Sequence, residues 1–190
     1  LRAIKGSRYE EYRRRWEKAG ELEVIQNYPI HLDFELHFGC NFQCPQCILQ
    51  VPKTEVTTEH PYHVSKRRTK LDFDLYSRII EGGVEHGLFS ITLNINNEPL
   101  LTKDIDKYIR YARDKGVVDI IMLTNASLLT RDMSVRLLES GLTKLYFSLD
   151  AIREETYTTV RKGGNFKQTM TNIHAFLNLK KELNQLTPIT

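Results

Sequence analysis

The chain has 190 residues, of which 41% are hydrophobic and 27% are charged, a balance typical of a soluble globular domain with one substantial core. Its net charge of +3 is too small to indicate a nucleic-acid-binding protein, which would carry a basic stripe. No apolar run is long enough to span a membrane, and residues 1–5 lack signal-peptide features. We therefore expect a cytoplasmic protein with neither nucleic-acid nor membrane partners.

Helix and strand patterns alternate along most of the chain. Ser7 and Glu10 have capping-box spacing and predict a charged helix up to Gly20, followed by a connector over residues 21–29. Apolar and polar residues alternate over residues 30–38, which predicts a strand. Residues 48–70 predict a long polar loop. Helices are then expected at 72–86, 104–115, 131–140 and 166–183, and strands at 90–96, 119–124, 144–149 and from 188 onward.

Such alternation of strands and helices predicts an α/β fold with a parallel sheet. The predicted strands have one polar face, formed by Asn94 and Asn96 in the second and by Tyr146 and Ser148 in the fourth. Polar faces suit a curled sheet around a wet lumen, because unpaired polar groups are costly in a packed core. We therefore predict a partial (β/α) barrel of parallel strands, and a flat doubly wound sheet is the alternative.

A closed eight-stranded barrel takes about 250 residues, so this chain is expected to stop inside its own domain after about four to five strands. Residues 30–190 would form an incomplete core domain, preceded by an N-terminal helix and connector at residues 1–29. The first residue is not methionine, and we expect the chain to be a piece of a longer protein.

Three cysteines, Cys40, Cys44 and Cys47, lie in one loop with C-x3-C-x2-C spacing. Their odd number and the lack of a signal peptide argue against a disulfide framework. A [4Fe–4S] cluster normally takes four cysteines, so three would leave one iron open to a small molecule. The alternative is a structural zinc site, which needs a fourth ligand, such as His37, His60 or His63.

This cysteine spacing, directly after a first strand, resembles the signature of the radical S-adenosylmethionine (radical SAM) superfamily. In that family the open iron chelates the methionine moiety, and one-electron reduction yields a 5′-deoxyadenosyl radical that abstracts hydrogen from a substrate. The resemblance implies a [4Fe–4S] cluster, S-adenosylmethionine and a one-electron reductant such as flavodoxin or ferredoxin. The residue before the third cysteine, often aromatic in the family and close to adenine, is Gln46 here.

Later segments resemble further family motifs in the same order. Asn96-Asn97-Glu98-Pro99 resembles Gly-Gly-Glu-Pro, which implies that the Asn97 backbone and Glu98 contact the amino group of S-adenosylmethionine. Asparagine replaces both glycines, and it is tolerant of positive φ. Thr124-Asn125-Ala126 resembles Thr-Asn-Gly, which implies a cofactor-binding role for Asn125.

The segment from Ser148 to Gly164 resembles the fourth-strand region of members with a C-terminal SPASM or twitch extension. That resemblance implies that Ser148 and Arg161 hold the carboxylate or ribose of S-adenosylmethionine. A guanidinium is well shaped for a carboxylate, although an arginine near a helix end can also serve the helix dipole alone.

The sequence thus predicts a radical SAM enzyme, an oxidoreductase-like hydrogen-abstracting catalyst with a substrate in the lumen. Members with the extension often modify peptides, so a peptide is the first expectation, closely followed by a small molecule such as a sugar or cofactor precursor. A non-catalytic metal-binding module and an inactive relative are the alternatives. Polar residues of the first strand would touch substrate, tune the cluster or pair with one another, namely His31, Asp33, Glu35 and His37.

Overall fold

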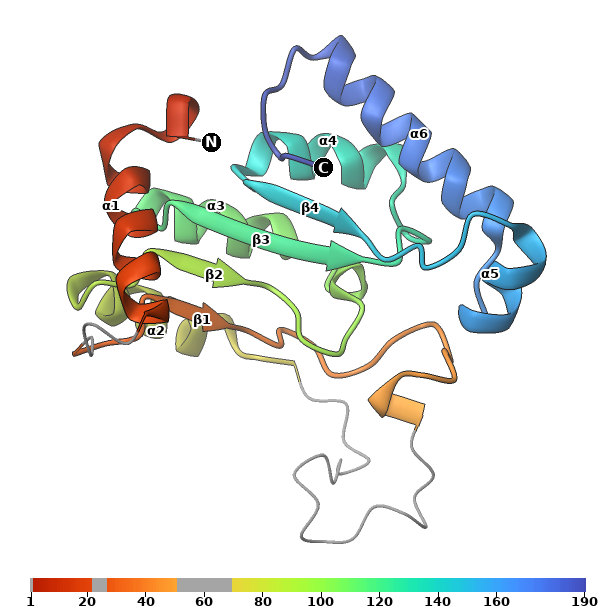
Figure 1. The fold of residues 1–190 in the computed structure, drawn as a ribbon, viewed down its shortest axis with the longest axis horizontal. Coiled ribbons are helices and arrows are strands. Elements are labelled where there is room, and N and C mark those ends of the chain that lie inside the picture. Colours follow the sequence, from red (N-terminus) through yellow and green to blue (C-terminus); the bar gives the residue numbers. More distant parts are fainter. Residues whose placement is uncertain (1, 22–26, 51–69) are drawn as a thin grey trace, which may run out of the picture.

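The computed structural model describes residues 2–21, 27–50 and 70–190. Within them, four strands form one parallel sheet in the order β1-β2-β3-β4 (Figure 1). The strands are β1 (His31–Asp33), β2 (Ser90–Thr92), β3 (Asp119–Thr124) and β4 (Lys144–Phe147). The helices are α1 (Arg2–Gly20), α2 (Phe73–Glu85), α3 (Ile105–Lys115), α4 (Arg131–Ser140), α5 (Glu154–Val160) and α6 (Phe166–Glu182), with short 3-10 helices η1 (Ile48–Gln50) and η2 (Pro99–Leu101).

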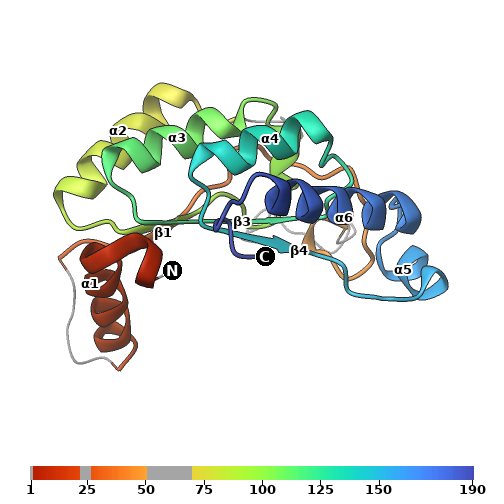
Figure 2. The same cartoon turned by 90° about the horizontal axis from the view of Figure 1, so that it is seen from above.

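The apolar face of the sheet lies beneath a layer of helices. Figure 2 shows α2, α3 and α4 side by side along this face, with α6 beside α4. Ile91, Ile120 and Leu145 come from neighbouring strands and are completely buried in the main core. The sheet is open rather than closed in the described residues, so the predicted partial (β/α) barrel is confirmed.

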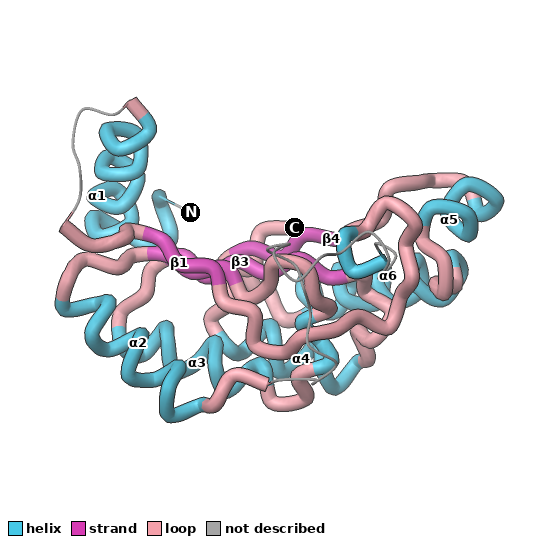
Figure 3. Tube along the Cα trace, turned by 90° about the horizontal axis from the view of Figure 1, so that it is seen from below, coloured by secondary structure: helices cyan, strands magenta, loops and turns pink. Residues whose placement is uncertain are grey.

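The opposite face of the sheet is polar, as predicted, but α1 covers its amino end. His31, Ser90 and Asp119 are neighbours in the register of β1, β2 and β3. Tyr12 of α1 is buried and stacks on Phe89, with ring centroids 6.2 Å apart. Figure 3, seen from below, shows α1 on the side of the sheet opposite α2, α3 and α4. The open part of the polar face therefore lies toward the carboxyl ends of the strands.

Several predicted helices have the expected bounds because their capping residues are strong signals. Asp72 caps α2 by accepting a hydrogen bond from the Asp74 backbone nitrogen, at 2.6 Å. Gly141 ends α4 in the left-handed conformation. Strand β3 also has the predicted bounds, and Ile189 forms a parallel bridge to Lys144 where a further strand was expected.

The first, second and fourth strands are shorter than predicted. The Phe34 nitrogen still donates to Thr92 of β2, at 2.8 Å, but further on the Leu36 carbonyl accepts a hydrogen bond from the Leu71 nitrogen at 2.9 Å. Ile95 was expected on the apolar face of a strand reaching residue 96, but it is 57% exposed because β2 ends at Thr92. Strand β4 ends at Phe147 rather than residue 149.

Other differences concern helices and loops. Helix α5 was not predicted, since its seven residues have no long apolar repeat. The helix expected from Ser7 belongs to α1, which continues back to Arg2 across a non-helical Gly6. Most of the connector at 21–29 and of the loop at 48–70 lies outside the described residues. No helix in the described part of the chain is long and apolar enough to cross a membrane.

We expect the replacement Asp119→Ala to lower the free energy of unfolding by about 3 kcal/mol, because it removes one partner of a buried ion pair. The Asp119 carboxylate is fully buried, lies 2.6 Å from the Lys144 ammonium and accepts a hydrogen bond from the Thr143 hydroxyl. Urea denaturation of the full-length protein measures the change. The control is Asp114→Ala, which removes a 62% exposed carboxylate paired with Arg113; an equal effect of the two replacements would contradict the prediction.

Candidate active site

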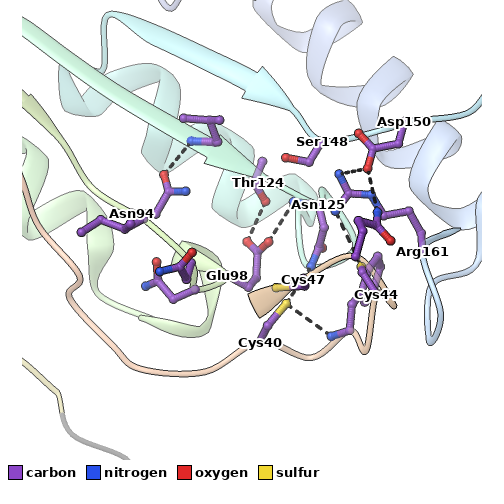
Figure 4. Close-up of a pocket in the computed structure, with 16 residues that line it drawn as sticks. Cys40, Cys44, Cys47, Asn94, Glu98, Thr124, Asn125, Ser148, Asp150 and Arg161 are labelled. Carbon is purple, nitrogen blue, oxygen red and sulfur yellow. Dashed lines mark hydrogen bonds and ion pairs between the residues drawn. The ribbon is translucent and has the colours of Figure 1, made fainter. Parts of the chain in front are cut away.

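The three cysteines lie in the loop that follows β1, at the carboxyl ends of the strands (Figures 1 and 4). Gly39 starts this loop with a φ of 138°, which favours glycine. Its carbonyl accepts a hydrogen bond from the Glu98 nitrogen at 3.0 Å, so the loop is joined to the segment after β2. Cys44 is buried and Cys40 and Cys47 are partly exposed, all three as free thiols.

A cavity of about 250 Å³ lies beside these cysteines. It is lined by residues from the carboxyl ends of several strands and from the end of α5 (Figure 4). Every residue that the sequence singled out as a cluster or cofactor ligand lines it, namely Cys40, Cys44, Cys47, Asn97, Glu98, Asn125, Ser148 and Arg161. The fold thus brings the eight together around one space.

Nitrogen donors approach two of the cysteine sulfurs. The Phe42 nitrogen lies 3.4 Å and the Asn125 side-chain nitrogen 3.8 Å from the Cys40 sulfur, and Arg161 Nη1 lies 3.8 Å from the Cys44 sulfur. Burial raises the pKa of the Cys40 thiol, and the nearby Glu98 carboxylate raises it further. A bound metal centre would supply the positive charge that a thiolate needs at this position.

A cubane cluster and a single zinc ion make different demands on the donor set. Each thiolate of a cubane cluster binds a different iron, whereas a structural zinc ion needs four ligands converging on one point. In the described ranges, no group of three or more His, Cys, Asp or Glu side chains converges in this way. Of the histidines considered as a fourth zinc ligand, His60 and His63 lie outside the described residues.

The Glu98 carboxylate is buried and accepts hydrogen bonds from three donors, so Glu98 is not a surface acid. Oε1 accepts from the Thr124 hydroxyl at 2.6 Å and from the Leu100 nitrogen at 3.1 Å, and Oε2 accepts from the Asn125 nitrogen at 2.8 Å. Burial raises the pKa of Glu98, against the lowering effect of these bonds. The side chain therefore caps η2 and joins the segment after β2 to the end of β3.

Two residues that line the cavity also carry buried polar atoms without a partner. The side-chain oxygen and nitrogen of Asn97, and Nε of Arg161, are buried and have no hydrogen-bond partner among the described residues. Leaving such groups unpaired costs about 1–3 kcal/mol each, so a polar ligand in the cavity would stabilise this arrangement. The residues present thus fit a polar cofactor beside the cysteine loop.

Left-handed backbone occurs at positions other than those expected. Neither Asn96 nor Asn97 has a positive φ, although each stands where the similar motif has glycine. Ala126 does, with a φ of 59°, and it stands where Thr-Asn-Gly has its glycine. Asp150 has the same value directly after the fourth-strand segment. The backbone at Asn96 and Asn97 is therefore not left-handed, and asparagine fits both positions without strain.

The polar residues of the first strand do not line the cavity. The His31 ring lies 2.8 Å from the Ser90 hydroxyl and 3.0 Å from the Asp33 carboxylate. His31 and Asp33 therefore pair with one another. Glu35 accepts a hydrogen bond from the Asn96 nitrogen at 2.9 Å. Its role is to fix the segment that leads to Asn97 and Glu98.

Contacts that hold the cysteine loop were not foreseen in the sequence. The Gln43 nitrogen donates to the Lys162 carbonyl at 2.7 Å. A Cβ on Gly164 would lie 2.8 Å from the ring of Phe42, so only glycine leaves room for this ring. The adjacent glycines Gly163 and Gly164 were the only sequence signal for this close packing. A glycine pair does not reveal which distant segment packs against it.

The open parallel β/α sheet, with a thiol-bearing loop and a polar cavity at the carboxyl ends of its strands, is the arrangement of a cofactor-dependent β/α-barrel enzyme. The family model of the radical SAM superfamily matches residues 34–187, and the chain belongs to this superfamily. Members of this family use a [4Fe–4S] cluster and S-adenosylmethionine.

Curated relatives and solved structures agree with this family. The chain is 28% identical over 140 residues to a GTP 3′,8-cyclase of Hydrogenovibrio crunogenus, covering 73% of this chain and 39% of that protein. It is 28% identical over 155 residues to an AdoMet-dependent heme synthase of Methanosarcina barkeri, covering 79% and 40%. The chain thus spans about two fifths of the length of these relatives.

The fold resembles that of SuiB from Streptococcus suis, solved with its precursor peptide SuiA. The TM-score is 0.63 at 16% identity, covering 88% of this chain and 34% of SuiB. SuiB bound to S-adenosylmethionine gives a TM-score of 0.62, with the same identity and coverage.

We expect Gly164→Ala to lower the melting temperature and the iron bound per protein after reconstitution, because the added methyl group displaces Phe42 and with it the cysteine loop. Such overpacking costs about 1–3 kcal/mol. The matched control is Gly82→Ala in α2, where a Cβ would meet nothing within 4 Å. Normal iron content in Gly164→Ala would show that the loop does not depend on this packing.

We expect Glu98→Gln to lower the free energy of unfolding by about 2 kcal/mol, because one buried donor would lose its acceptor. The glutamine amide can accept at only one of its two terminal atoms, whereas Glu98 accepts at both. Chemical denaturation of the variant tests this, with the exposed Glu139→Gln as control. Equal stability of the two variants would mean that the three bonds to Glu98 contribute little.

Proposed function

We propose that Cys40, Cys44 and Cys47 hold the [4Fe–4S] cluster and that S-adenosylmethionine binds in the adjoining cavity. The proposal rests on one observation: the only three cysteines of the chain and the five predicted cofactor-binding residues from later segments line one space. When bound, the reduced cluster supplies the electron that cleaves S-adenosylmethionine to the radical that abstracts hydrogen. The residues of this chain bind, orient and shield these groups.

Each polar residue has a proposed part in holding S-adenosylmethionine. Arg161, with Nε unpartnered and its guanidinium beside Cys44, would receive the carboxylate, and Ser148 would bind the carboxylate or ribose. Asn97 has a buried side-chain amide free for a polar contact, and Asn125 lies against Cys40. Glu98 would act on the amino group both directly and by fixing Asn125.

We propose a small molecule, in the class of cofactor precursors, as the substrate. The support comes from relatives whose names describe such chemistry, a GTP 3′,8-cyclase and an AdoMet-dependent heme synthase. A peptide substrate is the second candidate, favoured by the likeness of the fold to SuiB, which was solved with a precursor peptide. The sequence alone favoured a peptide, and the names of the relatives support placing the small molecule first.

Anaerobic reconstitution of the full-length protein with iron and sulfide tests the cofactor assignment. The wild-type protein is expected to gain the visible absorbance of a [4Fe–4S] cluster and, with dithionite, to release 5′-deoxyadenosine from S-adenosylmethionine. Cys44→Ala should lose both, because the loop would then offer only two of its three thiolates. Tight zinc binding without cleavage by the wild-type protein would contradict the proposal.

The substrate class is tested with the same reconstituted protein. GTP, the low-molecular-weight fraction of a cell extract and its peptide fraction are added separately, each with S-adenosylmethionine and dithionite. A small-molecule substrate is expected to raise 5′-deoxyadenosine release above the substrate-free rate. Stimulation by the peptide fraction alone would reverse the proposed order of candidates.

A further inference from the structure

Asp150 has a strained backbone at the edge of the cavity. It is one of three residues other than glycine with a positive φ in the described part of the chain, at 59°. This conformation is disfavoured for residues with a Cβ and is found preferentially at functional positions, with aspartate and asparagine among the most tolerant. The contacts of the Asp150 side chain are therefore a candidate reason for this backbone conformation.

The Asp150 carboxylate joins two segments that are far apart in the sequence. Its Oδ2 lies 2.6 Å from Nη2 of Arg161, at the end of α5, and 3.4 Å from the side-chain nitrogen of Gln46, in the cysteine loop (Figure 4). Gln46 stands where similar proteins often have an aromatic residue. Here a polar side chain is linked through Asp150 to the same arginine that approaches Cys44.

The ion pair fixes the guanidinium while leaving its other donors available. Arg161 has five N–H donors, and its Nη2 lies 2.6 Å from Asp150 Oδ2. Nη1 lies 3.8 Å from the Cys44 sulfur, and Nε is buried without a partner among the described residues. The Arg161 side chain is 15% exposed and that of Asp150 is 44% exposed, and both residues line the cavity.

We propose that Asp150 is a positioning residue, which acts through Arg161 to set the affinity for the carboxylate of S-adenosylmethionine. The inference rests on the proposed function, in which Arg161 receives that carboxylate. Holding Nη2 restricts the rotation of the Arg161 side chain, so less orientational freedom is lost when the ligand binds. Gln46 adds a second link from the same carboxylate to the cysteine loop.

Affinity for S-adenosylmethionine is the direct test, measured by equilibrium dialysis on the cluster-loaded full-length protein without a reductant, so that no turnover occurs. Asp150→Asn, which preserves shape and tolerates positive φ, is expected to raise the dissociation constant about tenfold. Asp150→Gly, which removes the carboxylate and relieves the backbone strain, should do the same. The iron content of each variant shows whether the cluster is intact.

The matched control is Asp132→Asn in α4. It also removes a carboxylate paired with an arginine, Arg136 at 3.1 Å, but its side chain is 80% exposed and lies outside the cavity. No change in affinity is expected. An equal loss in this control and in Asp150→Asn would overturn the proposal, because the effect would then be one of general charge.

A double-mutant cycle separates positioning from a merely structural effect. In an Arg161→Gln background, Asp150→Asn should change the dissociation constant by less than about twofold, because coupled residues are not additive. The same tenfold loss in both backgrounds would overturn the inference, as would unchanged affinity in Asp150→Asn while the wild-type protein binds normally. Failure of the wild-type protein to bind S-adenosylmethionine would overturn the proposed function as well.

Discussion

The buried carboxylate of Glu98 holds together the segments on which the site depends. It accepts hydrogen bonds from Thr124 and Asn125 at the end of β3, while its own backbone nitrogen donates to Gly39 at the start of the cysteine loop. Three consecutive strand ends are thereby joined through one residue. Because the carboxylate is removed from water, its bonds are stronger than surface bonds, and a change there would affect the loop, the strand end and the cavity together.

The residues of the site could be predicted because they stand in motifs that resemble those of the radical SAM superfamily. A parallel sheet places all its carboxyl ends at one edge, so motifs scattered from Cys40 to Arg161 line one cavity. The contacts between them could not be predicted in this way. The pairing of Asp150 with Arg161, and the three bonds to Glu98, depend on side-chain directions that periodicity does not specify.

Strand length was the weakest part of the sequence prediction, for a physical reason. Alternation of side chains persists wherever the backbone is extended, whether or not it pairs with a neighbour. Phe34 and Leu36 stay buried after β1 has ended, whereas Ile95 turns outward after β2. The polar faces were correctly read, but α1 could not be placed over their amino end, because the helix pattern alone does not say which surface its tyrosines cover.

The packing of Phe42 against Gly164, and the bond from Gln43 to the Lys162 carbonyl, have a consequence for biosynthesis. The cysteine loop leaves the ribosome well before residues 162–164, which form the turn that holds it. Until that turn has emerged and docked, the three thiols lack their native support. The proposed insertion of a cluster would thus follow the docking of this turn, and earlier exposure of the thiols to oxidants is a hazard of assembly.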